Sequence, residues 1–503
     1  GNANDPRWLG CFQDGAAVTG QALVKLGSDS IFDRPLIFLQ GFDPGIGNHW
    51  PEYGYGDFNW DIIWGCGEFG DSGIPGLSNL ISELLLHGFD LVFLDQSNGA
   101  ESIENQSALT RELIRLCRDY KLGDEPMVLI GPSLGGVVGR HALRSMEMNG
   151  EEHCTRLFAG LDSPFRGAWL PTSLQEAIPF FAGFSAEAEA MNAALHSPAA
   201  GQLLIHSPFH SSSVRQNLEN LQDLWGLPKD AICIATSNGN PSVDYSPSNP
   251  KIFDSSSSLL GWNYVDISLF THPGSVSHSS SNTEALVIFD AEIVNPEWTL
   301  GEPIVFEGMA WSGINLPEWN DLPGSYSTHL GLFRSALELS GIEANSCDNQ
   351  SMFIPVSSSV DIDLDLNAAN APNAFDAWSF ETPSAGSVYH CDLSAHSEFL
   401  TDWIVNGQPL SNSNTAPLNF ALLGWNVPQK KIVGSLNLAP LGKLEIGTAL
   451  ANGEGPWPIF EAYSNTCDGV IEIGAGGSMI IGDSISGSGA NMTLMKGSRL
   501  ILN

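Results

Sequence analysis

Short apolar runs alternate with stretches of helical spacing over residues 35 to 167. The apolar runs predict buried strands, and apolar residues recurring every three or four positions between them predict helices. The predicted strands cover residues 35–40, 89–95, 127–130 and 155–162, and the predicted helices cover 76–88, 102–120 and the stretch after Ser133. Gly88 follows one of these helices as a C-terminal cap. Strand and helix in alternation predict an α/β fold whose mostly parallel, doubly wound sheet is covered on both faces.

The pattern changes three times beyond this core. Residues 168–228 are helical but broken by Pro and Ser, which predicts a helical lid, and residues 241–345 carry short β-runs, which predict a β-rich insertion. From 409 to 503 the helical period disappears and alternation takes over, so residues 1–408 are expected to form the catalytic domain and 409–503 a smaller all-β domain. The similar stretches GKLEIG, GSMIIG and GSRLIL predict solenoid rungs or a sandwich. Because the sequence stops inside such a stretch, we expect the native protein to continue further.

Composition and charge narrow the function classes. Of the 503 residues, 43% are hydrophobic, which is typical of a folded globular chain. There are 57 acidic against 20 basic residues, a net charge of −37, which argues against nucleic acid or an anionic membrane as a partner. No apolar run reaches the roughly 18 residues of a transmembrane helix.

The eight cysteines are scattered without a CxxC pair, so zinc knuckles are not expected. An even number of cysteines in an acidic, Ser- and Asn-rich chain is typical of disulfides in an exported protein. The sequence therefore predicts a secreted or cell-surface location, although the amino terminus has the character of a mature or trimmed end rather than a signal peptide.

One serine stands between glycines where the strand 127–130 becomes a helix. Residues 131–135, Gly-Pro-Ser-Leu-Gly, match G-x-S-x-G in the strand–turn–helix context that the motif requires. A turn this tight strains the serine, and glycines two residues away on either side let neighbouring backbone approach. Ser133 is thereby presented at the carboxyl edge of the sheet, above a helix amino terminus that favours negative charge.

These residues resemble the α/β-hydrolase superfamily, in particular its lipase and esterase branch. Three segments show the resemblance: VLIGPSLGGVVGRHAL, LFAGLDSPFRGA and IFLQGFDPG. It covers residues 30–170 well and 350–406 loosely. Together the segments also resemble the large exported lipase-like proteins of Bacteroidetes-type bacteria, which carry C-terminal sorting regions.

The resemblance implies an oxyanion hole made of two backbone N–H groups. One belongs to Leu134, the residue after the nucleophile, and the other matches Phe42 in the loop after the first strand of the pattern. Gln40 replaces the histidine that the family usually carries there, which leaves the backbone donor intact. Such donors are typically worth roughly 3 kcal/mol each in the transition state.

The resemblance also sets the chain order of the triad as serine, acid, histidine. His396 is the predicted base because it precedes the amphipathic helix that ends the α/β pattern, and His390, six residues earlier, is the runner-up. Asp162 is the predicted acid, because pancreatic-lipase-like enzymes place their aspartate at the end of the same strand in a similar Gly-Leu-Asp context. The alternatives nearer the histidine are Asp348, Asp361 and Asp363.

The resulting expectation is a secreted serine hydrolase of carboxylic esters that needs no cofactor. The carboxylates of Asp361, Asp363 and Asp365 alternate along the chain and offer oxygen ligands for a structural calcium ion, although such clusters are more often a solvated face. The rival functions are an amidase or polyester depolymerase with the same triad, and an inactive surface adhesion protein. The C-terminal domain is expected to contact the cell surface or a polymer.

Overall fold

The computed structural model describes residues 7–13, 16–43, 76–183 and 186–241, then most elements between 251 and 406, and beyond 406 the strands alone. Its central sheet has the strand order β1-β2-β4-β3-β5-β6-β7-β15 before it continues into the C-terminal region. β3, β4, β5, β6, β7 and β15 run parallel, while β1 and β2 are antiparallel. The bounds are β1 (Arg7–Gln13), β2 (Ala16–Lys25), β3 (Pro35–Phe38), β4 (Asp90–Gln96), β5 (Met127–Pro132), β6 (Thr155–Leu161), β7 (Ile232–Ser237) and β15 (Ala377–Phe380). This mostly parallel arrangement confirms the predicted α/β-hydrolase fold.

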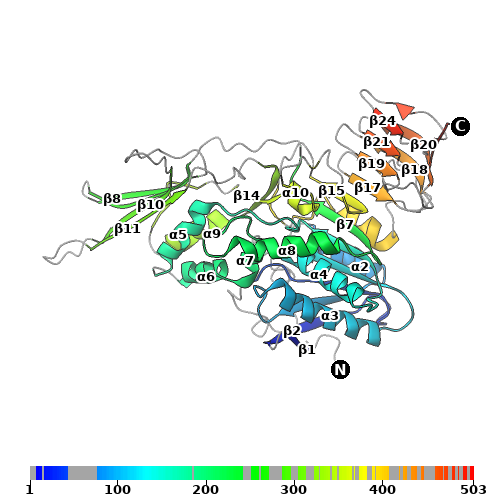
Figure 1. Cartoon of the computed structure of the whole chain (residues 1–503), viewed down its shortest axis with the longest axis horizontal. Helices are drawn as coiled ribbons and strands as arrows, with labels where there is room; N and C mark the ends of the chain where they lie inside the picture. The colour runs from blue at the N-terminus through cyan, green and yellow to red at the C-terminus, as the bar shows by residue number, and fades with distance from the viewer. Residues whose placement is uncertain are drawn as a thin grey trace.

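Helices cover both faces of this sheet, as the sequence predicts. α3 (Ile103–Tyr120) packs beside α4 (Leu134–Met148) on the face nearer the viewer in Figure 1. α2 (Leu77–Leu86) packs with α11 (Ser397–Thr401), which runs into a π-helical turn at Asp402–Asn406. The described strands β3, β4 and β5 are buried throughout, because a parallel sheet covered on both faces has no solvent side.

The helical stretch and the β-rich insertion form one subdomain rather than two. α5 (Thr172–Phe181) and α6 (Ala186–Leu195) pack with α9 (His329–Leu339) against an antiparallel sheet. That sheet has the order β11-β10-β9-β8-β13, with β8 (Lys251–Leu259), β9 (Trp262–Phe270), β10 (Leu286–Asn295), β11 (Ile304–Ser312) and β13 (Ser346–Cys347). Their apolar side chains make a second hydrophobic core around Phe181, Phe253 and Phe333. We call this unit the cap; Figure 1 shows it on the left.

The last helices of the predicted lid divide between cap and core. α7 (Pro198–Leu203) contributes Ala199 and Leu203 to the main core and Ala200 to the cap core, and α8 (Ser212–Trp225) packs on the main core through Leu218. Within the predicted range 168–228, α8 is therefore part of the hydrolase core. A small ribbon of β12 (Gly324–Ser327) and β14 (Ser351–Pro355), followed by α10 (Val356–Ser359), links the cap to the sheet.

The C-terminal strands alternate between two sheets with parallel pairing. β17 (Leu423–Val427), β19 (Lys443–Ile446), β21 (Val470–Ile473) and β24 (Asn491–Leu494) extend the central sheet, and β17 joins it by antiparallel pairing with β15. The second sheet contains β16 (Leu418–Asn419), β18 (Ile432–Leu438), β20 (Ile459–Cys467), β22 (Ser478–Ile481) and β25 (Arg499–Leu502), with β23 (Ile485–Ser486) beside β20. Alternate strands stacked in parallel follow the solenoid pattern. GSMIIG pairs with GSRLIL, whereas GKLEIG lies in the other sheet.

The cysteines of the described part are mostly isolated. Cys117, Cys154 and Cys233 are free thiols, and burial raises the pKa of Cys117 to about 12. Cys66 and Cys391 lie outside the described residues. Among the helices that the structure describes, none has the length and apolar character needed to span a bilayer.

Candidate active site

Ser133 occupies a strained turn between β5 and α4. Its backbone has φ 50° and ψ −128°, a conformation that costs a residue with a side chain about 1–3 kcal/mol. Its N–H donates to the carbonyl of Leu161 at 2.9 Å, which fixes the turn to the end of β6. The strain is the kind expected of the predicted nucleophile turn, and Ser133 sits at the carboxyl end of its strand.

The neighbouring glycines are required because backbone fills the space where a side chain would lie. A Cβ on Gly131 would stand 2.2 Å from the carbonyl carbon of Gly135, and one on Gly135 would stand 2.7 Å from the carbonyl oxygen of Gln40. A Cβ on Gly136 would overlap the hydroxyl of Ser163 at 2.0 Å. These contacts confirm the steric reason for the G-x-S-x-G pattern.

Asp162 lies at the end of β6, next to the serine turn. Register pairs Pro132 with Leu161, so Ser133 and Asp162 follow adjacent strands at the same edge. The Asp162 side chain is fully buried; one carboxylate oxygen accepts the N–H of Asn238 at 3.1 Å, and the other contacts Nδ1 of His390 at 2.7 Å. The Asp162 N–H donates to the carbonyl of Thr236 in β7. Asp162 is therefore held through its backbone by β7 and through its carboxylate by Asn238, just after β7.

The histidine against Asp162 is His390, which corrects the sequence prediction of His396. His396 is fully buried six residues further on, and its Nδ1 bonds the hydroxyl of Ser379 at 2.9 Å. Burial lowers the pKa of His396, which favours the neutral ring. The helix start identified the correct part of the chain, but the loop before it, rather than the helix cap, reaches the carboxylate.

Backbone hydrogen bonds hold the loop that carries His390. The His390 N–H donates to Tyr326 in β12 at 2.8 Å, and the Val388 N–H donates to Asn238 at 3.0 Å. The ring packs edge-on to Phe353 with centroids 5.0 Å apart. Its Nε2 is buried and has no hydrogen-bond partner among the described residues, as is also true of His396 Nε2. Sequence reasoning missed Asn238 and Tyr326, because an Asn after one strand and a Tyr in another carry no signal for a histidine loop.

A second histidine also contacts Phe353. His329 begins α9, with its ring 4.7 Å from that of Phe353. Burial, with a further contribution from His390, lowers the pKa of His329 to about 4, so the ring is neutral near pH 7. The cap therefore contributes an uncharged polar ring to the surroundings of His390.

The two predicted oxyanion donors belong to different segments, the first turn of α4 and the loop after β3. Leu134 is the first residue of α4, where an N–H has no acceptor within its own helix. Phe42 lies two residues beyond Gln40, whose carbonyl contacts the Gly135 position. Within the described part of the chain, the hydrogen bonds include none donated by the Phe42 or Leu134 N–H.

The alternative acids lie elsewhere. Asp361 accepts ion pairs from Arg140 at 2.9 Å and Arg166 at 2.7 Å, both largely buried. Asp363 is exposed, and Asp348 and Asp365 lie outside the described residues. Because two arginines already neutralise Asp361, its carboxylate is a poor calcium ligand.

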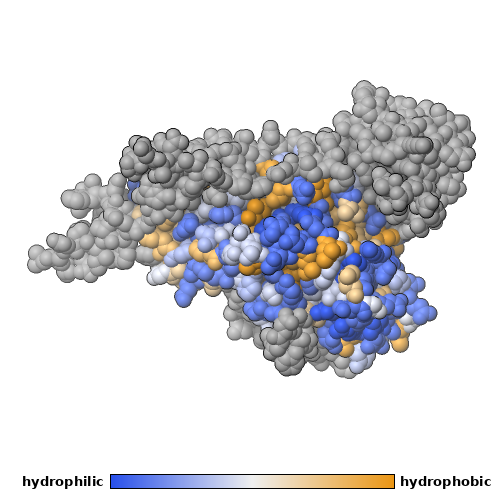
Figure 2. Space-filling model, viewed as in Figure 1, coloured by the Kyte–Doolittle hydropathy of each residue, from blue (hydrophilic) through white to orange (hydrophobic). Residues whose placement is uncertain are grey.

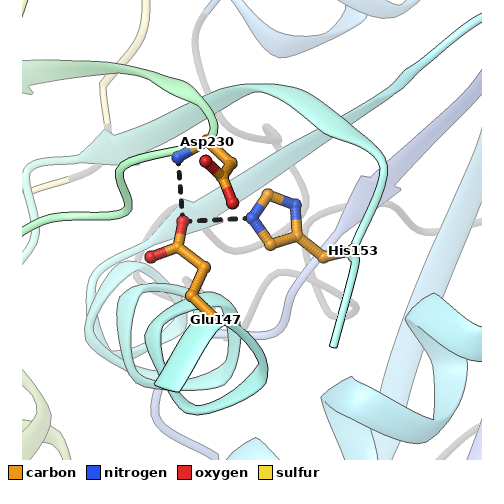
Figure 3. A group of neighbouring side chains, drawn as sticks. All are labelled: Glu147, His153 and Asp230. Carbon is orange, nitrogen blue, oxygen red and sulfur yellow. Dashed lines mark hydrogen bonds and ion pairs between the residues drawn. The ribbon is translucent and has the colours of Figure 1, made fainter. Parts of the chain in front are cut away.

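One other group has the residue types of a metal site. Ligand atoms of Glu147, His153 and Asp230 lie within 4.8 Å of one another at the end of α4 (Figure 3). Nδ1 of His153 accepts the Thr155 N–H, so its Nε2 carries the proton and donates to Glu147 at 3.2 Å. Although burial opposes it, hydrogen bonds from the Asp230 N–H and Arg144 hold the pKa of Glu147 below its usual value. The group is a hydrogen-bonded clamp, because no nitrogen lone pair remains for a metal.

No protein-family model and no curated protein matches the sequence. Similar solved structures include a fungal esterase from Rhizomucor miehei, a Bacillus licheniformis lipase in its propeptide form and a hyperthermophilic esterase from Pyrobaculum calidifontis. Their identities to this chain are 14%, 13% and 10%, each with a TM-score of 0.27, over 46%, 43% and 46% of this chain. The matches span 65%, 38% and 64% of these neighbours, less than two thirds of their length. The neighbours are esterases and lipases.

Proposed function

We propose that this protein is a serine hydrolase of carboxylic esters with Ser133 as nucleophile, His390 as base and Asp162 as acid. The observation that carries the proposal is the 2.7 Å contact between Asp162 and Nδ1 of His390, beside a strained serine at the same sheet edge. A carboxylate on Nδ1 fixes the tautomer and stabilises the imidazolium, as in serine-protease triads. The resemblance of the sequence to lipases and the esterase neighbours support the same class.

The reaction uses the chain's own groups and water. Ser133 Oγ attacks the ester carbonyl carbon while His390 Nε2 takes its proton, and the oxyanion accepts hydrogen bonds from Phe42 and Leu134. Collapse of the tetrahedral intermediate expels the alcohol, which receives the proton from His390. Water then attacks the acyl-enzyme through the same base and releases the acid.

The cap is proposed to shape the acyl site. Its apolar core packs separately from the hydrolase core, and β12 of the linking ribbon holds the His390 loop. An insertion placed over the carboxyl edge of this fold acts as a lid. The resemblance to exported lipase-like proteins with C-terminal sorting regions supports action outside the cell, and the solenoid-like strands offer a surface for a polymer.

A fluorophosphonate probe together with p-nitrophenyl esters of increasing chain length tests the proposal. We expect the wild-type chain to be labelled and to hydrolyse at least the short esters, and Ser133→Ala to lose both while it unfolds at the temperature of the wild type. Labelling of a folded Ser133→Ala chain would contradict the assignment. A wild-type chain that is never labelled would favour the rival function, a binding protein. Faster turnover of amides or polyesters than of simple esters would favour the rival enzymes.

A further inference from the structure

The side chain of Gln40 closes a small loop around the predicted oxyanion donor. Gln40 is 1% exposed and follows β3, and its Oε1 accepts the N–H of Gln96 at 2.9 Å. Its Nε2 donates to Oδ2 of Asp43 at 2.8 Å. Gly41 and Phe42 therefore lie between two residues that a hydrogen bond joins.

The orientation of this amide is determined by its partners. A backbone N–H can only donate, so the oxygen of Gln40 must face Gln96, and its NH₂ must face the Asp43 carboxylate. The N–H of Asp43 also donates to Gly99 at 3.3 Å, in the loop after β4. The loop is thus attached at one end to Gln96 in β4 and at the other to Gly99 in the loop after β4.

The two oxyanion donors differ in how they are held. Leu134 belongs to a buried helix and is fixed by it, whereas Phe42 lies in a loop without regular structure. A donor contributes to catalysis only when it is already aimed at the developing charge. The start of this loop is held against the serine turn, where the Gln40 carbonyl approaches Gly135. The end of the loop is held by the hydrogen bond from Gln40 to Asp43.

We propose that Gln40 and Asp43 are positioning residues that aim the Phe42 N–H at the oxyanion. The inference rests on the proposed ester hydrolysis. It assigns to the side chain of Gln40 a role that does not follow from the histidine usually found at this position in the family. The hydrogen bond from Gln40 to the partly buried Asp43 carboxylate is of a stronger kind, because one partner is charged. The Gln40–Asp43 hydrogen bond would thus hold the Phe42 N–H in place, as helix α4 holds the Leu134 N–H.

A reversal of the hydrogen bond separates positioning from folding. Gln40→Glu places two carboxylates against each other, and we expect kcat to fall by about 10²-fold with KM changed by less than about threefold, the effect of a lost oxyanion donor. Asp43→Asn keeps a neutral acceptor for Nε2 in place of the charged one, so we expect kcat to fall, but by about tenfold or less and by less than in Gln40→Glu. In the double variant Gln40→Glu/Asp43→Asn, the new amide at position 43 donates to the new carboxylate at position 40, which still accepts the Gln96 N–H. We expect the double variant to recover kcat to within about tenfold of the wild type.

The readouts include the affinity of a boronic acid transition-state analogue, which should fall and recover in parallel with kcat/KM. Gln222→Glu is the matched control, because Gln222 is a glutamine of α8 that is 4% exposed and the substitution adds the same charge away from β3. We expect its kcat to stay within about threefold of the wild type.

Each outcome decides one point. Ser133-dependent ester hydrolysis that is unchanged in Gln40→Glu overturns this inference alone, and so does a double variant as slow as the single one. A Gln222→Glu chain as slow as Gln40→Glu shows a general effect of buried charge and also overturns it. A wild-type chain that neither hydrolyses esters nor reacts with the probe overturns the proposed function, and the positioning role with it.

Discussion

Five non-glycine residues in the described part of the chain have a positive φ; Ser133 and Asp162 lie at the candidate site, and Ser30, Cys154 and Asp361 lie elsewhere. Among the described residues, Ser133 has φ 50° and Asp162 φ 45°, and Asp361, which pairs with Arg140 of the serine helix, has φ 57°. Residues with side chains adopt this region only where their surroundings enforce it. Here the Ser133 and Asp162 amides each donate to a neighbouring strand, so the strain is balanced by hydrogen bonds that also aim the two side chains.

The choice between the two histidines is testable directly. His390→Ala should reduce kcat by about 10⁴-fold, because the base and the nucleophile act together. His396→Ala should instead lower the free energy of unfolding and leave kcat of the folded chain within about tenfold, since it removes a buried hydrogen bond to Ser379. Ser379→Ala controls for that bond. A larger kcat loss in His396→Ala than in His390→Ala would refute the corrected assignment.

His141 predicts a pH dependence of stability. It lies on α4 with Nδ1 bonded to Ser107 at 2.8 Å, and burial lowers its pKa to about 4. The unfolded chain binds this proton near pH 6.5 and the folded chain only near pH 4, so stability is present above pH 6.5 and is lost as the pH falls through this window. We expect this histidine to lower the free energy of unfolding by about 2 kcal/mol as the pH falls from 7 to 5. Denaturant unfolding of His141→Gln should show that much less loss, and an unchanged pH dependence would contradict the prediction.

At the scale of elements, an ion-pair network joins segments that the sequence leaves far apart. Arg140 lies in α4, Arg166 in the loop after β6, and Asp361 just after α10. Arg166 also pairs with Asp223 of α8 at 2.6 Å. The network therefore ties the serine helix, the Asp162 loop and the ribbon that positions His390.

Asp361→Asn tests the role of this network. Removal of the Asp361 charge leaves the buried Arg140 without its ion-pair partner and Arg166 with Asp223 alone, and an uncompensated buried charge typically costs about 3–5 kcal/mol. We expect that loss in the free energy of unfolding, with kcat of the folded chain within about tenfold and no response to added Ca²⁺. Asp363→Asn, at an exposed position, is the control and should be close to neutral. Restoration of Asp361→Asn by calcium would instead support the calcium site.

For the whole molecule, charge is the dominant property. The net charge of −37 implies self-repulsion in the compact state. Figure 2 shows that hydrophilic residues dominate the described surface around α3, at the lower right of the view. Salt screens the repulsion between exposed like charges that are further apart than the Debye length.

We therefore expect the melting temperature to rise as NaCl increases from about 10 mM to about 300 mM, where the Debye length shrinks from roughly 30 Å to less than about 8 Å. Calorimetry in the two buffers measures the shift, and a neutral osmolarity control with sucrose separates screening from solute exclusion. A melting temperature that falls or stays constant would show that repulsion does not limit stability.

The sequence by itself determined the local features of this protein. Periodicity located the strands and helices of the sheet, and the glycines around Ser133 predicted a turn whose close backbone contacts the structure confirms, because both signals depend on neighbouring residues. Tertiary structure decided what depends on distant segments. His390 and His396 lie six residues apart in one loop region, and only the anchoring to Tyr326 and Asn238 selects the one that meets Asp162. The sequence predicted a separate lid and a separate β-rich insertion, because their helices and strands share a core only in the folded chain. The packing of α8 on the main core could not be predicted for the same reason.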